Sequence, residues 1–234
     1  MHFLYRWSKN IQTRLLGPSC VLCRAPAPLT QDLCADCKAE LPWLESACRH
    51  CALALPATAA HRICRACRTR PLAEQAIAAL HYRPPADWLI TRLKFNARMP
   101  HARLLGDLLA ERIAAGDIAT PDCLVPVPLH PINLRQRGFN QAERIARRIA
   151  RQLDVSIAMR GIERRRATQR QSMLAASERR ANIRDAFACD VDLAGAHIAI
   201  VDDVVTTGHT VRALAACLRS AGARRVDLYA VARA

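Results

Sequence analysis

The stretch "HIAIVDDVVTTGHTV", residues 197–211, places two adjacent aspartates between a run of strand-forming residues and a turn of hydroxyls and glycine. Residues 197–201 are typical of a buried strand, and the chain from Val211 onward has apolar side chains at helical spacing. Two like charges side by side repel each other and cost stability. We therefore expect water or a bound ligand to compensate for Asp202 and Asp203.

The region around this stretch predicts an α/β domain. From about residue 76, segments typical of strands alternate with segments typical of helices. The further strands are expected at 76–82, 122–129 and 224–232, and the helices at 87–95, 102–116 and 140–153. This alternation predicts βαβ units and a largely parallel sheet. Ligands of such sheets bind at the carboxyl ends of the strands, where the two aspartates stand.

Four Cys-x-x-Cys motifs precede this domain. Each motif aims two thiolates at one point, and two motifs complete a tetrahedral all-thiolate zinc shell. Eight thiolates predict two structural zinc ions. Sequential pairing of the motifs is the simpler arrangement, and the spacing leaves interleaved pairing open. The predicted ligands are Cys20, Cys23, Cys34, Cys37, Cys48, Cys51, Cys64 and Cys67.

Two other uses of these cysteines fit the sequence less well than zinc. Disulfides need an oxidising compartment, and we recognise no secretory signal peptide in the sequence. A thioredoxin-like redox site uses one such motif at a helix start, whereas four occur here in series. No apolar run approaches the roughly 20 residues of a membrane span, and we predict a cytoplasmic protein.

Composition changes along the chain and predicts two domains. All 13 prolines lie at or before position 131, and eight of the 11 cysteines lie before residue 68. We predict a small double zinc-ribbon domain over 1–75 and the α/β domain over 76–234. The net charge of +15 indicates affinity for polyanions: nucleic acid, phosphorylated metabolites or an acidic membrane surface.

The loop over residues 206–210 has the properties of an anion cradle. It follows a strand and precedes a helix, so backbone N–H groups and the helix N-terminus converge there. Gly208 allows a close backbone turn, and neighbouring threonines can add hydroxyl donors. Neither a Walker loop nor a Gly-x-Gly-x-x-Gly turn is present. Carboxylates just before such a cradle suit a ribose 5-phosphate, with a divalent cation as a possible bridge; a solvated Asp-Asp turn is the alternative.

This constellation resembles the binding motif of the type I phosphoribosyltransferases. The resemblance implies that Asp202 and Asp203 face the ribose hydroxyls of phosphoribosyl pyrophosphate, bound with Mg²⁺. It also implies a substrate-binding loop that comprises Val204, Val205, Thr206, Thr207, Gly208, His209 and Thr210.

Two longer segments, behind the four cysteine motifs, resemble the ComF/GntX family. They are "VPVPLHPINLRQRGFNQAE" (125–143) and "RRRATQRQSMLAASERRANIRDAF" (164–187), the latter with matching residues Thr168, Gln171, Arg179 and Asn182. The resemblance runs from about Cys20 to residue 234. It implies that Arg164, Arg165 and Arg166 lie on the pyrophosphate side, under a flexible hood, and that Arg135 and Arg137 flank a pyrophosphate loop. Lys94 also matches, with its role left open.

The family includes competence proteins associated with handling incoming DNA, and two functions follow from the resemblance. The first is phosphoribosyl transfer to an unidentified acceptor, with pyrophosphate leaving and with the competence or helicase machinery as partner. The second is a non-catalytic module that senses phosphoribosyl pyrophosphate or binds single-stranded DNA. Because aromatic residues are only 4%, DNA binding would depend on backbone phosphates. No general base and no acceptor-recognising residue is identifiable.

Overall fold

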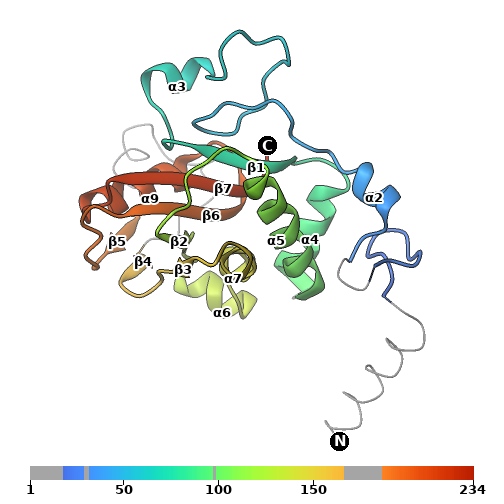
Figure 1. The fold of residues 1–234 in the computed structure, drawn as a ribbon. Coiled ribbons are helices and arrows are strands. Elements are labelled where there is room, and N and C mark those ends of the chain that lie inside the picture. The colour runs from blue at the N-terminus through green and yellow to red at the C-terminus, as the bar shows by residue number, and fades with distance from the viewer. Residues whose placement is uncertain (1–17, 29–31, 97–98, 166–185) are drawn as a thin grey trace, which may run out of the picture. The chain divides into compact units, whose positions relative to one another are not determined.

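The computed structural model describes residues 18–28, 32–96, 99–165 and 186–234 (Figure 1). The chain divides into two compact units, Met1–Leu41 and Pro42–Ala234. The second cysteine group therefore belongs to the same compact unit as the α/β fold. The domain boundary near residue 75 stays a prediction, because compact packing and independent folding are different properties.

The larger unit is built on a five-stranded sheet whose neighbouring strands are all parallel, which confirms the predicted class. Its two longest strands lie in the interior of the sheet, side by side (Figure 1). In spatial order the strands are β1 (Ala76–His81), β7 (Arg225–Arg233), β6 (His197–Val205), β2 (Cys123–Pro126) and β3 (Ser156–Ile157).

Helices connect these strands and cover the sheet. They are α4 (Ala86–Asn96), α5 (Met99–Ala114), α6 (Pro131–Arg137), α7 (Gln141–Leu153) and α9 (His209–Ser220). The connection from β2 through α7 runs toward one edge of the sheet, and the connection from β6 through α9 runs toward the other. Because such crossovers are right-handed, α7 and α9 lie on opposite faces. The strand order therefore reverses between β2 and β6, and ligands of open parallel sheets bind at this kind of reversal.

The amphipathic patterns of α7 and α9 are explained by their packing. Asn140 caps α7, since its side chain accepts a hydrogen bond from the Ala142 N–H. Ile145 and Ile149, four residues apart and so on one face of α7, are fully buried. The inner stripe of α9 is buried at Val211, Ala213, Leu214, Ala215 and Leu218.

Strand β6 is longer than the sequence pattern indicated. The expected strand ended at residue 201, with both aspartates beyond it, but β6 continues to Val205 and pairs with β7 along that length. Val204 and Val205 are β-branched and continue the ladder after the carboxylates. Asp202 and Asp203 thus lie within the strand, where its geometry controls their directions.

A smaller antiparallel pair joins β4 (Ile162–Arg164) to β5 (Phe187–Cys189). A disulfide between Cys189 and Cys217 links β5 to α9. Residues 166–185 lie outside the described part of the chain. Within the described ranges, no helix combines the length and apolar character needed to cross a membrane.

Candidate ligand site and cysteine tetrads

The two adjacent aspartates point to opposite faces of the sheet, because side chains alternate along a strand. Asp203 is 3% exposed. Its Oδ2 lies 2.5 Å from Nζ of Lys94 in α4, and its Oδ1 accepts a hydrogen bond of 3.1 Å from Nε2 of Gln141 in α7. The side chain is therefore held by two helices. This contact gives Lys94, whose role the sequence left open, a defined place at the site.

Asp202 is compensated less completely. It is partly exposed, and its Oδ1 accepts the backbone N–H of Asp203 at 2.9 Å. Burial, and then the neighbouring Asp203 carboxylate, raise the pKa of Asp202 well above its ordinary value, while Lys94 acts in the opposite direction. An incompletely compensated carboxylate near the carboxyl end of a buried strand is suited to accept a hydroxyl group or to coordinate a cation.

The "RGFNQ" motif forms the turn between α6 and α7. Gly138 ends α6 with a left-handed φ of 78°, a conformation that side chains disfavour. Asn140 donates from Nδ2 to the Val127 carbonyl at 2.9 Å, which fixes the chain just beyond β2. Gln141 accepts from Arg137 at 2.5 Å and donates to Asp203. The motif thus connects the segment after β2 with an acidic residue of β6, a role that the sequence analysis did not assign to Gln141.

The predicted anion cradle lies directly after β6. Gly208 is the N-cap of α9, with φ of 76°, and is buried, whereas Thr206 and Thr207 are exposed and Thr210 is partly exposed. Helix α9 begins at His209, which is exposed. The loop and the first turn of α9 therefore present backbone N–H groups and hydroxyls together at the strand-order reversal.

The predicted arginines occupy different surroundings. Arg164 ends β4 with its guanidinium 5.6 Å from the Phe187 ring centroid; burial lowers its pKa, while attraction to Asp202 raises it. Arg165 is exposed, and its N–H bonds to the Ala186 carbonyl. The structure thus places one of the three near the acids. The other predicted residues of this segment, Arg166, Thr168, Gln171, Arg179 and Asn182, lie outside the described residues.

Arg135 and Arg137 both lie in α6, beside the loop that follows β2. Arg135, with Arg164, lines a cavity of about 450 Å³ between α6, the loop after β2 and β4. Arg137 instead donates to Gln141. Arg135 therefore borders a cavity that Arg164 also lines, and Arg137 contacts Gln141, the residue that holds Asp203.

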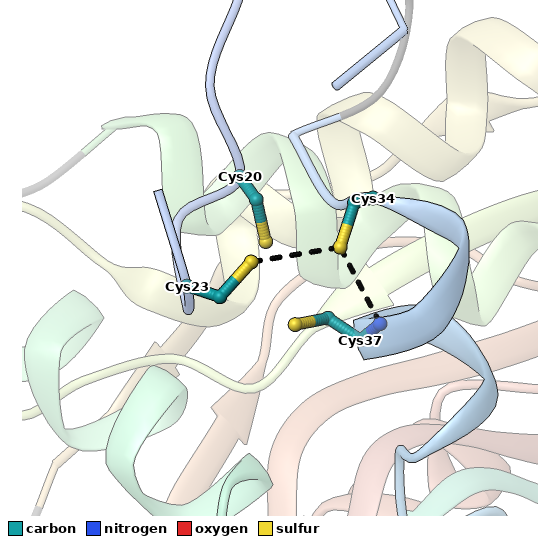
Figure 2. Close-up of side chains that lie close together, drawn as sticks. All are labelled: Cys20, Cys23, Cys34 and Cys37. Carbon is teal, nitrogen blue, oxygen red and sulfur yellow. Dashed lines mark hydrogen bonds between the residues drawn. The ribbon is translucent and has the colours of Figure 1, made fainter. Parts of the chain in front are cut away.

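The eight cysteines gather into two tetrads in chain order, which resolves the pairing that the spacing left open. In each tetrad the Sγ atoms lie within 4.8 Å of one another. The first tetrad, Cys20, Cys23, Cys34 and Cys37, is drawn in Figure 2, where all four side chains point toward one another; Cys34 also caps helix α2 (Ala35–Ala39). The second is Cys48, Cys51, Cys64 and Cys67, next to helix α3 (Arg65–Thr69).

Both tetrads fit a four-thiolate zinc ion. Thiolates bound about 2.3 Å from one tetrahedral zinc lie about 3.8 Å apart. The Sγ atoms of Cys23 and Cys34 are 3.6 Å apart, and those of Cys51 and Cys64 are 3.7 Å apart. The donor set and its spacing support structural zinc at both tetrads, since four thiolates leave no position for a reacting ligand.

Comparisons with known proteins agree with this geometry. Residues 140–234 match the phosphoribosyl transferase domain model, and residues 11–68 match the double zinc ribbon domain model. Among solved structures, a glutamine phosphoribosylpyrophosphate amidotransferase from B. subtilis, complexed with ADP and GMP, aligns with a TM-score of 0.38 and 22% identity over 54% of this chain and 25% of that one. The two matched domain models identify a phosphoribosyl transferase domain preceded by a double zinc ribbon.

Two relatives specify the family. The DNA utilization protein YhgH of Escherichia coli K12 is 36% identical over 184 residues, 76% of this chain and 81% of the relative. Competence protein F of Haemophilus influenzae is 32% identical over 174 residues, 71% of this chain and 76% of the relative. The chain belongs to the ComF/GntX family of competence protein F-like proteins.

Proposed function

We propose that the chain binds phosphoribosyl pyrophosphate at the carboxyl ends of β6 and β2 and transfers its phosphoribosyl group to an acceptor. The observation that carries the proposal is the sequence of groups at the end of β6. A partly compensated Asp202 is followed within a few residues by a loop that turns at Gly208 into the N-terminus of α9. A ribose with a 5-phosphate offers hydroxyls for the carboxylate and an anion for the loop.

Each part of the site has a role in this proposal. The loop 206–210 holds the 5-phosphate through backbone N–H groups and threonine hydroxyls. Asp202 accepts a ribose hydroxyl, and Asp203, held by Lys94 and Gln141, keeps the end of β6 in register. Arg164 and Arg135 lie on the side of the loop after β2, where they would stabilise the leaving pyrophosphate.

The reaction is a displacement at the anomeric carbon of the ribose. The bond from that carbon to pyrophosphate breaks through an oxocarbenium-like state, and a bond to the acceptor forms. Mg²⁺, for which the partly exposed Asp202 carboxylate is a suitable oxygen ligand, would neutralise charge on the pyrophosphate. The chain's own residues orient the ribose and bind charge that develops on the leaving group. No described residue is assigned as the base for the acceptor.

A second candidate is a binding module without catalysis, acting in the handling of DNA. The names of the two relatives, DNA utilization protein and competence protein F, and the net charge of +15 favour it. It would sense phosphoribosyl pyrophosphate, or bind single-stranded DNA through phosphates, in the cytoplasm beside the competence machinery. Both candidates use the same site and differ in whether pyrophosphate is released.

The deciding experiment follows pyrophosphate. Zinc-loaded protein is incubated with phosphoribosyl pyrophosphate, Mg²⁺ and pools of bases, amines and oligonucleotides. We expect acceptor-dependent release that falls at least about 100-fold in Asp202→Asn, the scale of one lost transition-state contact. Asp154→Asn, a charge-matched change at the far end of α7, should retain activity. Tight binding without release favours the sensor, and absence of binding contradicts both phosphoribosyl readings.

A further inference from the structure

The two cysteine tetrads have the same ligands but different surroundings. The first belongs to the unit Met1–Leu41, and Cys23 in it is exposed. All four cysteines of the second tetrad are buried, and they share one hydrophobic core with Val205 at the end of β6 and Val211 in α9. We call residues 206–210 the phosphate loop, after the role proposed for them. The second tetrad is thus packed into the same core as β6 and α9, the elements on both sides of the phosphate loop.

Arg233 in β7 joins the second tetrad to the start of that loop. Its Nε donates to the Cys51 carbonyl at 3.1 Å, and its Nη1 donates to the Val205 carbonyl at 3.0 Å. A planar guanidinium that donates in two directions holds both carbonyls in a fixed relation. Because Val205 immediately precedes Thr206, the position of the loop depends on the position of the Cys48–Cys51 turn.

A second set of contacts joins the segment after the second tetrad to the turn at Gly208. The Leu72 side chain, 3% exposed, lies so close to Gly208 that a Cβ there would be 2.9 Å from Leu72 Cδ2. In the first turn of α9, Arg212 donates to the carbonyls of Pro71 at 3.3 Å and Arg70 at 3.5 Å. The segment 70–72, which follows Cys67 of the second tetrad, therefore packs against the phosphate loop at Gly208 and bonds to the first turn of α9.

The Cys48–Cys51 turn also holds that supporting segment. The N–H of Ala73 donates to the His50 carbonyl at 3.1 Å, and Nδ1 of His50 lies 2.9 Å from the Ala73 carbonyl. In addition, the N–H of Ala76 donates to the Arg49 carbonyl at 2.7 Å, where β1 begins. Both links to the phosphate loop thus start from backbone that the second tetrad organises.

We propose that zinc at the second tetrad holds the phosphate loop in its ligand-binding conformation, with Arg233 and Leu72 as positioning residues. Four metal–thiolate bonds would fix the Cys48–Cys51 and Cys64–Cys67 turns together, whereas buried thiols alone form only weak hydrogen bonds. By thermodynamic reciprocity, a phosphoribosyl ligand at the loop then strengthens zinc binding at this tetrad. The identity of that ligand rests on the proposed function.

Zinc release tests the coupling in the unmodified chain. Release to a chromophoric chelator is timed with and without phosphoribosyl pyrophosphate and Mg²⁺, and Cys34→Ser, which disables the first tetrad, assigns the phase that belongs to the second. We expect the ligand to slow that phase about tenfold, within the usual range of allosteric coupling, and to leave the first-tetrad phase unchanged. Arg233→Met should reduce the effect to less than about twofold.

Calorimetric titration of the same ligand separates two failures. Ligand binding without slower zinc release would overturn the coupling and leave the proposed function intact. Absence of ligand binding would overturn the proposed function and the ligand-dependent half of this proposal. The positioning half is tested without ligand, by amide hydrogen exchange.

In that measurement, Arg233→Met should raise exchange at residues 205–212 about tenfold relative to the unmodified protein, as expected for a locally loosened segment. Arg224→Met is the matched control, because its side chain is exposed and donates only a 3.4 Å bond to Gly195. Equal exchange in the two variants would overturn the coupling. A uniform rise across β6 and β7 in Arg233→Met would also overturn it, since it would indicate a general contribution to stability.

Discussion

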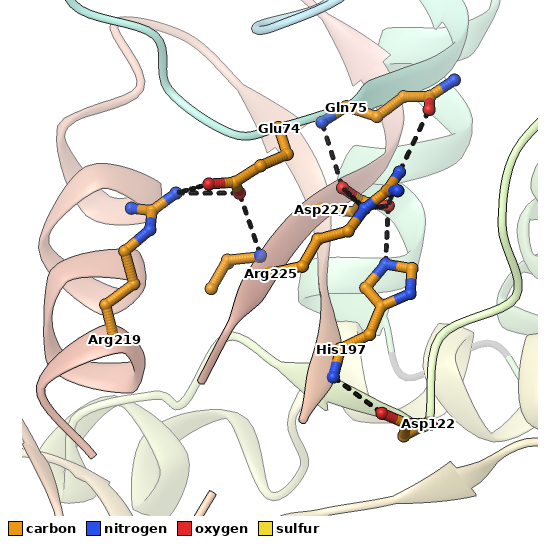
Figure 3. Close-up of polar contacts among 8 residues, drawn as sticks. Glu74, Gln75, Asp122, His197, Arg219, Arg225 and Asp227 are labelled. Carbon is orange, nitrogen blue, oxygen red and sulfur yellow. Dashed lines mark hydrogen bonds and ion pairs between the residues drawn. The ribbon is translucent and has the colours of Figure 1, made fainter. Parts of the chain in front are cut away.

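Buried acidic residues lie at the amino edge of the sheet, where its parallel strands begin, and at the carboxyl edge, where the strands end. Their charges are compensated to different degrees. At the amino edge, Asp227 is fully buried and accepts hydrogen bonds from the Gln75 N–H, from Arg225 and from Nε2 of His197, as Figure 3 shows. Both of its carboxylate oxygens are engaged by donors. Such a network stabilises a position and leaves little for a ligand to add.

At the carboxyl edge, Asp203 has two side-chain partners, while Asp202 beside it has a raised pKa. A bound cation or a hydroxyl group would stabilise the ionised form of this carboxylate. The contrast separates two kinds of buried charge within one sheet. The charge of Asp227 is fully engaged and holds Gln75 to the fold, whereas the charge of Asp202 is less completely compensated.

The largest effect on stability should come from removing the charge of Asp227 at the amino edge. Asp227→Asn removes a charge that Arg225 and His197 surround and places amide hydrogens against their donors, so we expect a loss of about 3–5 kcal/mol in the free energy of unfolding. Denaturant unfolding measures it. Arg219→Met, which removes an exposed ion pair with Glu74 in the same network (Figure 3), should cost only about 0–1 kcal/mol. Equal losses of unfolding free energy in the two variants would contradict the expectation that the buried ion pair contributes more stability than the exposed one.

An intermediate effect is expected for Lys94→Met at the carboxyl edge. The change leaves the buried Asp203 without its cation, but Lys94 is itself 25% exposed in its side chain. The cost should therefore lie between the about 1 kcal/mol of an exposed pair and the about 3–5 kcal/mol of a fully buried one. Thermal unfolding and calorimetric titration of phosphoribosyl pyrophosphate measure stability and binding together. A neutral result in both would show that Gln141 alone holds Asp203.

The smallest effect should have the opposite sign. Because the pKa of Asp202 is raised in the folded protein, the unfolded chain loses this proton at a lower pH than the folded one, so stability falls as the pH rises from about 4 to the raised pKa. Asp202→Asn should therefore stabilise the free protein near neutral pH, and only modestly, because Asp202 is partly exposed and solvent screens its charge. The advantage should disappear below about pH 4, where the carboxyl is protonated in both the folded and unfolded states.

Unfolding curves across this pH range check the sign, and binding of phosphoribosyl pyrophosphate with Mg²⁺ is measured in parallel. We expect the stabilised variant to bind more weakly, because it lacks the charge that a cation would compensate. Lower stability of Asp202→Asn at neutral pH would mean that Asp202 is as fully compensated as Asp227, and the contrast between the two edges would fail.

Much of this molecule was predictable from local patterns. The Cys-x-x-Cys turns are local, so their number indicated two metal sites, and the alternation of apolar periods indicated a parallel sheet with helices. The stretch 197–211 indicated a strand, a turn and the start of a helix, because each of these is encoded by neighbouring residues, while the anion cradle in that turn stays a prediction.

Other features depended on residues far apart in the chain. The continuation of β6 through Asp202 and Asp203 required pairing with β7, and the roles of Lys94 and Gln141 required two helices to meet at one carboxylate. The local spacing of the cysteines did not distinguish the two tetrads, although the second shares one hydrophobic core with β6 and α9.

The sequence by itself therefore determined the class of fold, the two four-cysteine groups and the place of the candidate ligand site. Only the tertiary structure decided which aspartate is held by two helices and which is less completely compensated, and which tetrad shares a hydrophobic core with β6 and α9. The physical reason is that turns and periodicity depend on neighbours within a few residues. Charge compensation and packing depend instead on which distant side chains the sheet topology brings together.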